Sequence, residues 1–336
     1  MYYKDLLRFR GAWLGAALIW IILYHLPFDL GPVNFLRAIG YGGVDICFFA
    51  SGIGCYYSLS SRPDCISFMK RRIKRLIPTY LIFILVWLAF KLVEGGFGLR
   101  MAVGNLLALQ HFTGHGESFN WYIGTSFLFY ILAPYFKGII DRACTPLRVL
   151  FIVFLFACSV PFWGAETYII VVSRLPVFYI GMLFGRLCRE DRQISRGHAF
   201  MMVASFIFGT AFLVLSILLA PQYVWSHGLF WYPFIFITVP LCTAMSAVFR
   251  ALEKTKITAP VVSFLFLCGD YSLELYLVHL LLVSCIPFVI ERLELQSLAP
   301  IAWAVGLLLL IVGCFALRRI VSLCLRLLFR GGKAEG

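Results

Sequence analysis

The chain has few charged residues and no long polar segment. Only 13% of its 336 residues are charged, about half the share usual in soluble domains, whereas 62% are hydrophobic. No loop between the apolar runs is long enough to fold a separate core, and we find no internal repeat or low-complexity linker. These absences exclude a soluble globular protein. They predict one integral membrane domain that occupies residues 1–336.

The eleven cysteines include no Cys-x-x-Cys pair. Zinc sites and dithiol redox sites are commonly built from such closely spaced pairs. Most of the cysteines lie in apolar runs, where a thiol behaves as a small apolar side chain. We therefore predict neither a disulfide framework nor a metal site.

Acidic residues are also scarce. The chain has 16 Asp and Glu against 29 Lys and Arg, which gives a formal net charge of +13. A basic excess can indicate nucleic-acid binding, but here the positive residues stand between hydrophobic runs. That distribution is typical of membrane topology. We predict contacts with membrane lipids and no nucleic-acid partner.

Long apolar runs dominate what is present. A membrane-spanning helix needs about 20 predominantly apolar residues, and roughly ten segments meet that criterion. The predicted fold is an all-α, polytopic bundle of about ten transmembrane helices. The predicted spans are roughly 11–27, 39–59, 76–94, 120–136, 147–163, 168–188, 199–219, 228–249, 260–290 and 299–325.

Basic residues predict how these spans are oriented. If the N-terminus is cytoplasmic, the inner segments carry 24 Lys and Arg, and the outer loops carry only Arg37, Arg100 and Arg292. Cytoplasmic loops are enriched in Lys and Arg, and an even number of spans returns the chain to its starting side. We therefore predict a multi-pass protein of the cytoplasmic (inner) membrane, with both termini in the cytoplasm.

Two segments depart from simple spanning helices. The outer connection 95–119 is long and half apolar, so we expect it to re-enter the membrane or to lie along its surface. It contains His111 and His115, a spacing that can chelate a metal on a helix, but no compelling third ligand stands nearby. Segment 260–290 is too long for one straight span. We expect a break near Gly269 and a spanning helix from Tyr271.

The first span carries one titratable side chain, His25, near its outer end. Ionisable groups inside a membrane are costly and often functional. Asp45 stands in the first turns of the second span at a similar predicted depth, and a short loop makes the two spans expected neighbours. A carboxylate beside an imidazole fixes its tautomer and raises its basicity, as a general base requires. The pair is either catalytic or a structural contact between two helices.

Further polar groups fall inside the predicted spans. Lys91 and Arg174 stand near outer ends, where long cationic side chains often extend to the interface. In segment 260–290, Ser272, Tyr276 and His279 share one helix face. This face serves either interhelical hydrogen bonding or a functional site.

The densest basic stretch, KRRIKR at residues 70–75, precedes the third span. Arg72 and Arg75 are three residues apart, so on a helix their guanidinium groups would face the same anion. The stretch is either a topology determinant that attracts anionic lipid head groups or a clamp for phosphate groups. Spacing alone does not separate these interpretations.

Six segments, in order, resemble the recurring blocks of the acyltransferase-3 family, whose members O-acylate cell-surface glycans and related acceptors. The resemblance runs from about residue 8 to residue 320. The matching segments are LIWIILYH, GGVDICFFASGIG, FMKRRIKRLIPTY, NWYIGTSFLFYILAPY, RLPVFYIGMLFG and GDYSLELYLVH.

The resemblance implies a ten-helix enzyme that takes an acyl group from cytoplasmic acyl-coenzyme A. Acetyl-coenzyme A is the default co-substrate because acetyl is the commonest acyl group in the family. The acceptor would be a hydroxyl of a cell-surface polysaccharide or lipid-linked glycan. His25 matches the family's essential histidine and Asp45 the acid of the second block. Arg72 and Arg75 match an Arg-x-x-Arg pair that holds the donor's phosphates, and Arg71 is added to that predicted donor site.

The predicted acceptor site comes from later blocks. Tyr276 and His279 match the end of the last block, while Arg174 and Trp121 are predicted to frame the acceptor entrance, where Trp121 would stack on a sugar ring. One position departs from the family pattern, which commonly has Arg or Lys eleven residues before the essential histidine. That position is Leu14, and the nearest candidate for the supporting cation is Arg10.

Two functions of different classes follow. The favoured prediction is an integral membrane O-acetyltransferase in which His25 deprotonates the acceptor hydroxyl or carries the acyl group itself. The alternative is a proton-coupled transporter or flippase for a glycan or lipid intermediate, with His25, Asp45 and His279 as a proton relay. Transporters often show repeats and paired broken helices, whereas this chain has no repeat and one expected break. No oligomeric state is assigned.

Overall fold

The computed structural model describes residues 2–113 and 120–330. Within these ranges the chain is helical, with no strand beyond an isolated bridge between Tyr2 and Gln193, so the predicted all-α class is confirmed. The α-helices are α1 (Tyr3–Leu7), α2 (Arg10–His25), α3 (Asn34–Ala38), α4 (Gly43–Ser61), α5 (Cys65–Glu94), α6 (Leu99–Leu106), α7 (Trp121–Arg142), α8 (Thr145–Ala157), α9 (Glu166–Val172), α10 (Leu175–Arg189), α11 (Arg196–Leu219), α12 (Pro233–Leu252), α13 (Ala259–Asp270), α14 (Ser272–Arg292) and α15 (Ala299–Arg330). Short 3₁₀ helices are η1 (Gly31–Val33), η2 (Gly40–Gly42), η3 (His111–Thr113), η4 (Val160–Phe162), η5 (Pro221–Tyr223) and η6 (Gln296–Leu298).

Nine helical segments of the described residues are long and apolar enough to cross a membrane. The remaining predicted span, 11–27, is α2, whose 16 residues rise only about 24 Å. A bilayer core is about 30 Å thick, so α2 alone is shorter than a full span. It ends at His25 because Pro27 disfavours helical geometry at Leu26. The protein is thus an all-α, polytopic membrane protein.

The break predicted in segment 260–290 is present. Helix α13 ends at Asp270 and α14 begins at Ser272, with Tyr271 in a non-helical conformation between them. The connection 95–119 contains α6 and η3. His115 lies outside the described residues, so its predicted pairing with His111 stays a prediction.

Backbone contacts divide the chain into two compact units. The first comprises residues 1–24, 29–69 and 124–270, and the second comprises residues 25–28, 70–123 and 271–336. Helices α2, α5 and α7 each have residues in both units. Each unit is described by itself, and the predicted single domain stays a prediction.

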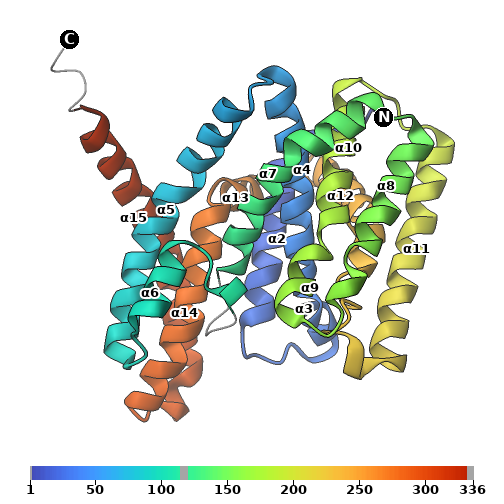
Figure 1. Cartoon of the computed structure of the whole chain (residues 1–336). Helices are drawn as coiled ribbons and strands as arrows, with labels where there is room; N and C mark the ends of the chain where they lie inside the picture. Colours follow the sequence, from blue (N-terminus) through green and yellow to red (C-terminus); the bar gives the residue numbers. More distant parts are fainter. Residues whose placement is uncertain (1, 114–119, 331–336) are drawn as a thin grey trace. The chain divides into compact units, whose positions relative to one another are not determined.

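In the first unit, α4 and α10 pack side by side (Figure 1). A Cβ atom on Gly52 of α4 would meet the carbonyl oxygen of Phe178, and one on Gly181 of α10 would meet that of Phe49. Gly181 and Gly185 form a Gly-x-x-x-Gly pair, a spacing that lets membrane helices approach closely. In lipid, helix association relies on such van der Waals contact because lipid tails are as apolar as the side chains.

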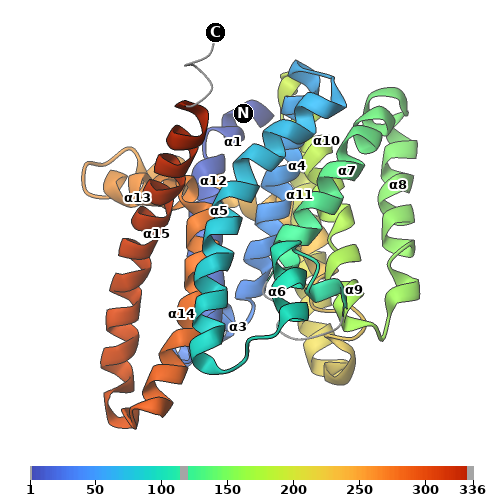
Figure 2. The same cartoon turned by 60° about the vertical axis from the view of Figure 1, so that its left-hand side comes forward.

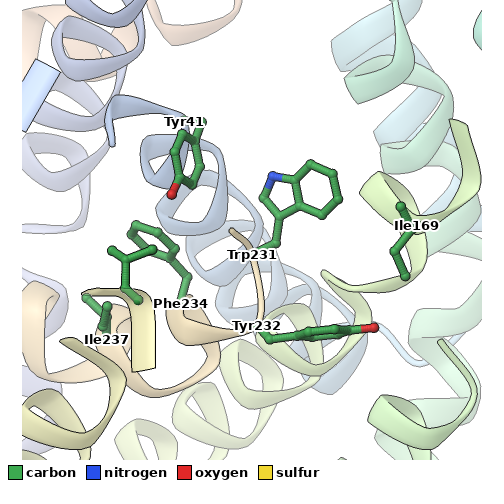
Figure 3. Close-up of a cluster of buried hydrophobic side chains, with 7 residues drawn as sticks. Tyr41, Ile169, Trp231, Tyr232, Phe234 and Ile237 are labelled. Atoms are coloured by element: carbon green, nitrogen blue, oxygen red, sulfur yellow. The ribbon is translucent and has the colours of Figure 1, made fainter. Parts of the chain in front are cut away.

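Aromatic side chains fill the core of this unit beside α12 (Figure 3). Tyr41 packs against Phe234 with ring centroids 5.6 Å apart. The phenol oxygen of Tyr232 points away from Phe234 in Figure 3, and it lies 2.6 Å from the Ser159 hydroxyl. The polar tip of Tyr232 therefore finds a partner while its ring stays buried.

In the second unit, α14 packs against α15 (Figure 2). Arg318 of α15 donates from Nε to Glu274 Oε1 of α14 at 3.0 Å, and its guanidinium group lies 3.5 Å from the Tyr271 ring centroid. Tyr80 of α5 donates from its hydroxyl to the Asn105 carbonyl oxygen at 2.5 Å. These contacts hold α15 to α14 and α6 to α5.

Candidate active site

His279 is held in one tautomer by its own helix. Its side chain is 2% exposed, and Nδ1 lies 2.9 Å from the carbonyl oxygen of Leu275, one turn earlier on α14. A carbonyl oxygen can only accept a hydrogen bond, so Nδ1 carries the proton and Nε2 carries a lone pair. Among the described residues, Nε2 is buried and has no hydrogen-bond partner. The second unit therefore contains an oriented imidazole nitrogen, His279 Nε2, that can still accept a hydrogen bond.

His25 lies beside this acceptor. It is the last residue of α2 and is partly exposed, and its ring centroid is 5.2 Å from that of His279, with the planes tilted by 57°. Both histidines belong to the second unit. Two imidazoles predicted separately from the sequence are thus brought together.

Aromatic rings continue from the histidine pair towards η3. Tyr276 contacts His279 with centroids 5.8 Å apart, and Tyr122 contacts Tyr276 at 4.8 Å. Trp121 follows Tyr122 at 6.3 Å, and His111 follows Trp121 at 6.4 Å. The predicted substrate residues Trp121, Tyr276 and His279 therefore lie along one row of rings. Tyr122 was missed, although it stands beside Trp121 in the same sequence block.

A buried amide cluster lies at the start of α7, just before Trp121. Asn120 Nδ2 donates to Asn105 Oδ1 at 3.1 Å and to the Tyr80 hydroxyl at 3.4 Å. Asn120 Oδ1 is buried, and no hydrogen bond reaches it from the part of the chain that the structure describes. Sequence reasoning did not assign Tyr80 or Asn105 to the site. Tyr80 ends the Leu-Ile-Pro-Thr-Tyr segment, but nothing in that pattern identifies its partners.

Asp45 of the first unit forms a buried ion pair with Arg174. The two side chains are 0% and 1% exposed, and Arg174 Nε lies 3.6 Å from Asp45 Oδ1. Arg174 also donates from Nη1 to the Ile170 carbonyl at 2.6 Å and lies 5.0 Å from the ring centroid of Trp231. Within the described ranges, neither Asp45 oxygen has a hydrogen-bond partner. Asp45 and His25 belong to different units, so the pairing predicted between them stays a prediction.

Comparison with known families places the chain in a class of proteins. The acyltransferase-3 family model, described as "Acyltransferase domain", matches residues 15–319. The chain belongs to this acyltransferase family. It is therefore a multi-pass membrane acyltransferase that requires an acyl donor, as the sequence analysis predicted. None of the curated proteins and none of the solved structures compared with the chain matches it.

In this acyltransferase, the basic stretch is part of a spanning helix. Residues 70–75 lie within α5, which continues through Pro78 to Glu94. Arg72 is 8% exposed, Arg71 is partly buried and Arg75 is exposed. The three arginines thus share one helix but differ in accessibility, and their role at the donor phosphates stays a prediction.

The other predicted cations are bound to nearby groups. Arg10 donates from Nε to the Ala50 carbonyl oxygen of α4 at 3.0 Å. Lys91 is buried, forms an ion pair with Glu94, and lies 5.1 Å from the Trp87 ring centroid. Arg10's role as the supporting cation and Arg174's role at the acceptor entrance stay predictions.

The described side chains contain no group of three or more His, Cys, Asp or Glu residues arranged to hold a metal ion.

Proposed function

We propose that the enzyme transfers an acyl group, acetyl by default, from cytoplasmic acyl-coenzyme A to a hydroxyl of a cell-surface polysaccharide or lipid-linked glycan. The observation that carries the proposal is the His25–His279 pair, with centroids 5.2 Å apart and an unused acceptor at His279 Nε2. Acyl transfer to a hydroxyl needs a general base, and imidazole is the commonest one. The family match over residues 15–319 supports the reaction class.

His25 takes the proton from the acceptor hydroxyl as its oxygen attacks the thioester carbonyl. The carbon–sulfur bond then breaks, the acyl group remains on the acceptor oxygen, and the thiol leaves with a proton returned by His25. His279 Nε2 offers an acceptor for an N–H of His25 and so orients the protonated ring. Many acyl-transfer enzymes use such a residue to orient the base, in addition to the base and the nucleophile.

The donor and the acceptor are assigned to different parts of the chain. Arg71, Arg72 and Arg75 hold the phosphates of coenzyme A, since guanidinium groups bind phosphate in a bidentate manner. The excess of basic residues in the inner segments supports placing these arginines in the cytoplasm and the protein in the cytoplasmic (inner) membrane.

The row of rings formed by Trp121, Tyr122 and Tyr276 receives the sugar, with Arg174 at the acceptor entrance. Aromatic faces and polar tips together suit a ligand that has both apolar and hydroxyl surfaces. Asp45, whose charge Arg174 balances, remains the second candidate catalytic group. Arg10 remains the candidate for the supporting cation.

Complementation tests the proposal in cells. Cells without the gene receive the wild-type chain, His25→Ala or His227→Ala, and base-labile acyl esters on their surface glycans are measured by mass analysis. His227 is the matched control because its Nδ1 already pairs with the Ser226 hydroxyl at 2.8 Å, outside the histidine pair. Wild type and His227→Ala restore the esters, and His25→Ala does not.

A second assay follows the thiol released from acetyl-coenzyme A by purified protein supplied with glycan-containing membrane extract. His25→Ala lowers this rate by about 10²–10⁴-fold, the usual contribution of a general base. Full activity of His25→Ala contradicts the mechanism. Uptake of a glycan intermediate into vesicles that depends on a proton gradient, but not on acyl-coenzyme A, favours the transporter alternative.

A further inference from the structure

An apolar groove of about 840 Å³ lies within the first unit. It is lined by residues of α8, α10, α11 and α12, together with Tyr3 of α1. Helix α10 contacts both α8 and α12, and α12 contacts α11, so the groove separates α8 from α11. Its α11 lining runs from His198 to Phe212, a rise of about 21 Å. One leaflet contributes about 15 Å to the hydrocarbon core, so the groove is long enough for a lipid chain.

The middle of the groove offers no free polar group to a ligand. Of its lining residues, only Tyr3, His198 and Ser205 carry hydroxyl or imidazole groups. Pro240 has no N–H, so the carbonyl of Phe236 loses its helical donor, and the Ser205 hydroxyl donates to that carbonyl at 2.8 Å. Because this hydroxyl is already used, the interior suits a hydrocarbon chain rather than a sugar.

The end of the groove at the start of α11 is basic. His198 lines this end, its ring centroid lies 5.9 Å from that of Tyr3, and its Nδ1 is buried. Arg148 directly precedes the lining residue Val149, and its Nε is also buried. Neither nitrogen receives or donates a hydrogen bond within the described ranges. One lining residue, His198, and the residue before the lining residue Val149, Arg148, thus have unused hydrogen-bonding groups.

Two acidic residues near this end, Asp191 and Glu190, already form ion pairs, and Asp5 accepts a hydrogen bond from the Tyr2 amide. Lys4 pairs with Asp191 at 2.7 Å, and Arg186 donates to Glu190 at 2.5 Å. The hydrogen bond from Arg186 lowers the pKa of Glu190, so this carboxylate stays ionised and paired. Arg196, which opens α11, forms no ion pair with any described residue. The local charge is therefore positive and complementary to an anionic head group.

We propose that this groove binds one acyl chain of an anionic glycerophospholipid, with the lipid phosphate at Arg148 and His198. The hydrocarbon chain lies between α8 and α11, and the basic end selects the head group by charge, as polybasic sites near membranes do. The lining shares no residue with the histidine pair, so the inference does not rest on the proposed acyl transfer.

Native mass spectrometry of the purified full-length protein tests the site. The probes are phosphatidylglycerol and phosphatidylcholine with identical acyl chains. Val153→Trp fills one wall of the groove at a residue that is 56% exposed, and Val203→Trp adds the same ring to α11 at a residue that is 58% exposed and outside the lining. The wild type and Val203→Trp retain phosphatidylglycerol in preference to phosphatidylcholine. Val153→Trp lowers bound phosphatidylglycerol by about tenfold, which corresponds to ~1.4 kcal/mol of binding free energy.

Arg148→Gln tests the head-group end, with Arg142→Gln as a control at a basic residue that does not adjoin a lining residue in the sequence. Arg148→Gln lowers the preference for phosphatidylglycerol by about fivefold, the effect of one basic residue near an anionic lipid. Equal retention of the two lipids by the wild type overturns the proposal, as does equal lipid loss in Val153→Trp and Val203→Trp. If Val153→Trp does not fold, a photoactivatable phosphatidylglycerol is crosslinked to the wild type. Labelling of residues 201–212 supports the site, and labelling confined to other helices overturns it.

Discussion

The ring centroids of His25 and His279 lie 5.2 Å apart, and the carbonyl oxygen of Leu275 sets the tautomer of His279. The second histidine thus presents a lone pair beside the first, which ends α2. An imidazole that must gain and lose a proton benefits from a neighbour that can accept its other N–H. In the proposed mechanism the two histidines have different tasks: His25 acts on the reacting groups, and His279 orients His25.

Substitutions of His279 distinguish an acceptor at Nε2 from a packing role. His279→Gln places an amide oxygen near the position of Nε2 and is expected to keep more activity than His279→Asn, whose shorter amide lies near Nδ1. His279→Phe keeps the ring volume without an acceptor and is expected to lower kcat by roughly 10²-fold, at the lower end of acid–base effects. The measurement is thiol release from acetyl-coenzyme A, with His227→Phe as the control. Equal activity in the Gln, Asn and Phe variants contradicts the acceptor role.

The arginines of α5 are expected to act on donor binding. Arg72→Gln/Arg75→Gln removes two phosphate partners and is expected to raise KM for acetyl-coenzyme A by about tenfold or more. The value of kcat is expected to change little, because the lost contacts stabilise the bound donor equally in the ground state and the transition state. Lys70→Gln/Lys74→Gln is the matched control, since it removes the same charge from the same stretch at exposed positions. If both double variants raise KM equally, the stretch attracts the donor by net charge alone. If the arginine variant lowers kcat with KM unchanged, the clamp is wrong.

The Asp45–Arg174 pair is expected to matter for stability through the cost of an unpaired buried charge. Arg174→Met leaves the carboxylate of Asp45 without its partner and is expected to lower the free energy of unfolding by about 3–5 kcal/mol. The double variant Asp45→Leu/Arg174→Met removes both charges and is expected to lose less than Arg174→Met alone. Unfolding of these variants and of Asp45→Leu in detergent, followed by circular dichroism, completes the double-mutant cycle. Additive losses would mean that the two side chains are not coupled.

The contact between α4 and α10 is expected to tolerate no side chain at Gly181. Gly181→Leu forces apart the two backbones that meet at Gly181 and Phe49, and overpacking of this kind costs about 1–3 kcal/mol or more. Gly138→Leu is the control because a Cβ atom on this glycine of α7 meets nothing within 4 Å. The midpoint of thermal unfolding is expected to fall for Gly181→Leu and to change little for Gly138→Leu. Equal midpoints would show that the close approach does not contribute to stability.

Much of the helical framework could be predicted from the sequence. Apolar runs of sufficient length predict helices because backbone groups in lipid must form their hydrogen bonds within the segment. The break between α13 and α14 was expected from the length of its segment and its Gly-Asp step, and the end of α2 follows from Pro27. The first span was predicted too long, because apolar character continues past the last helical residue, His25.

The candidate site was predicted in its residues but only partly in its contacts. His25, Tyr276, His279 and Trp121 were all named from the sequence, and the structure places them in one unit along a row of rings. The sequence related Tyr276 to His279 because both lie on α14, where helical spacing defines a face. It related His25 to His279 only in the transporter alternative, as members of a proton relay, and spacing could not show that their rings are in contact, since they lie on different helices.

The sequence by itself determined the all-α membrane class, the approximate helix boundaries, the side chains placed in apolar segments and the acyltransferase family. These depend on composition, local spacing and ordered motifs. Only the tertiary structure decided that Asp45 meets Arg174, that His279 offers Nε2 beside His25, and that an apolar groove separates α8 from α11. Position along a helix sets the depth of a side chain, but its partner depends on which helices are neighbours and on how each is rotated about its axis.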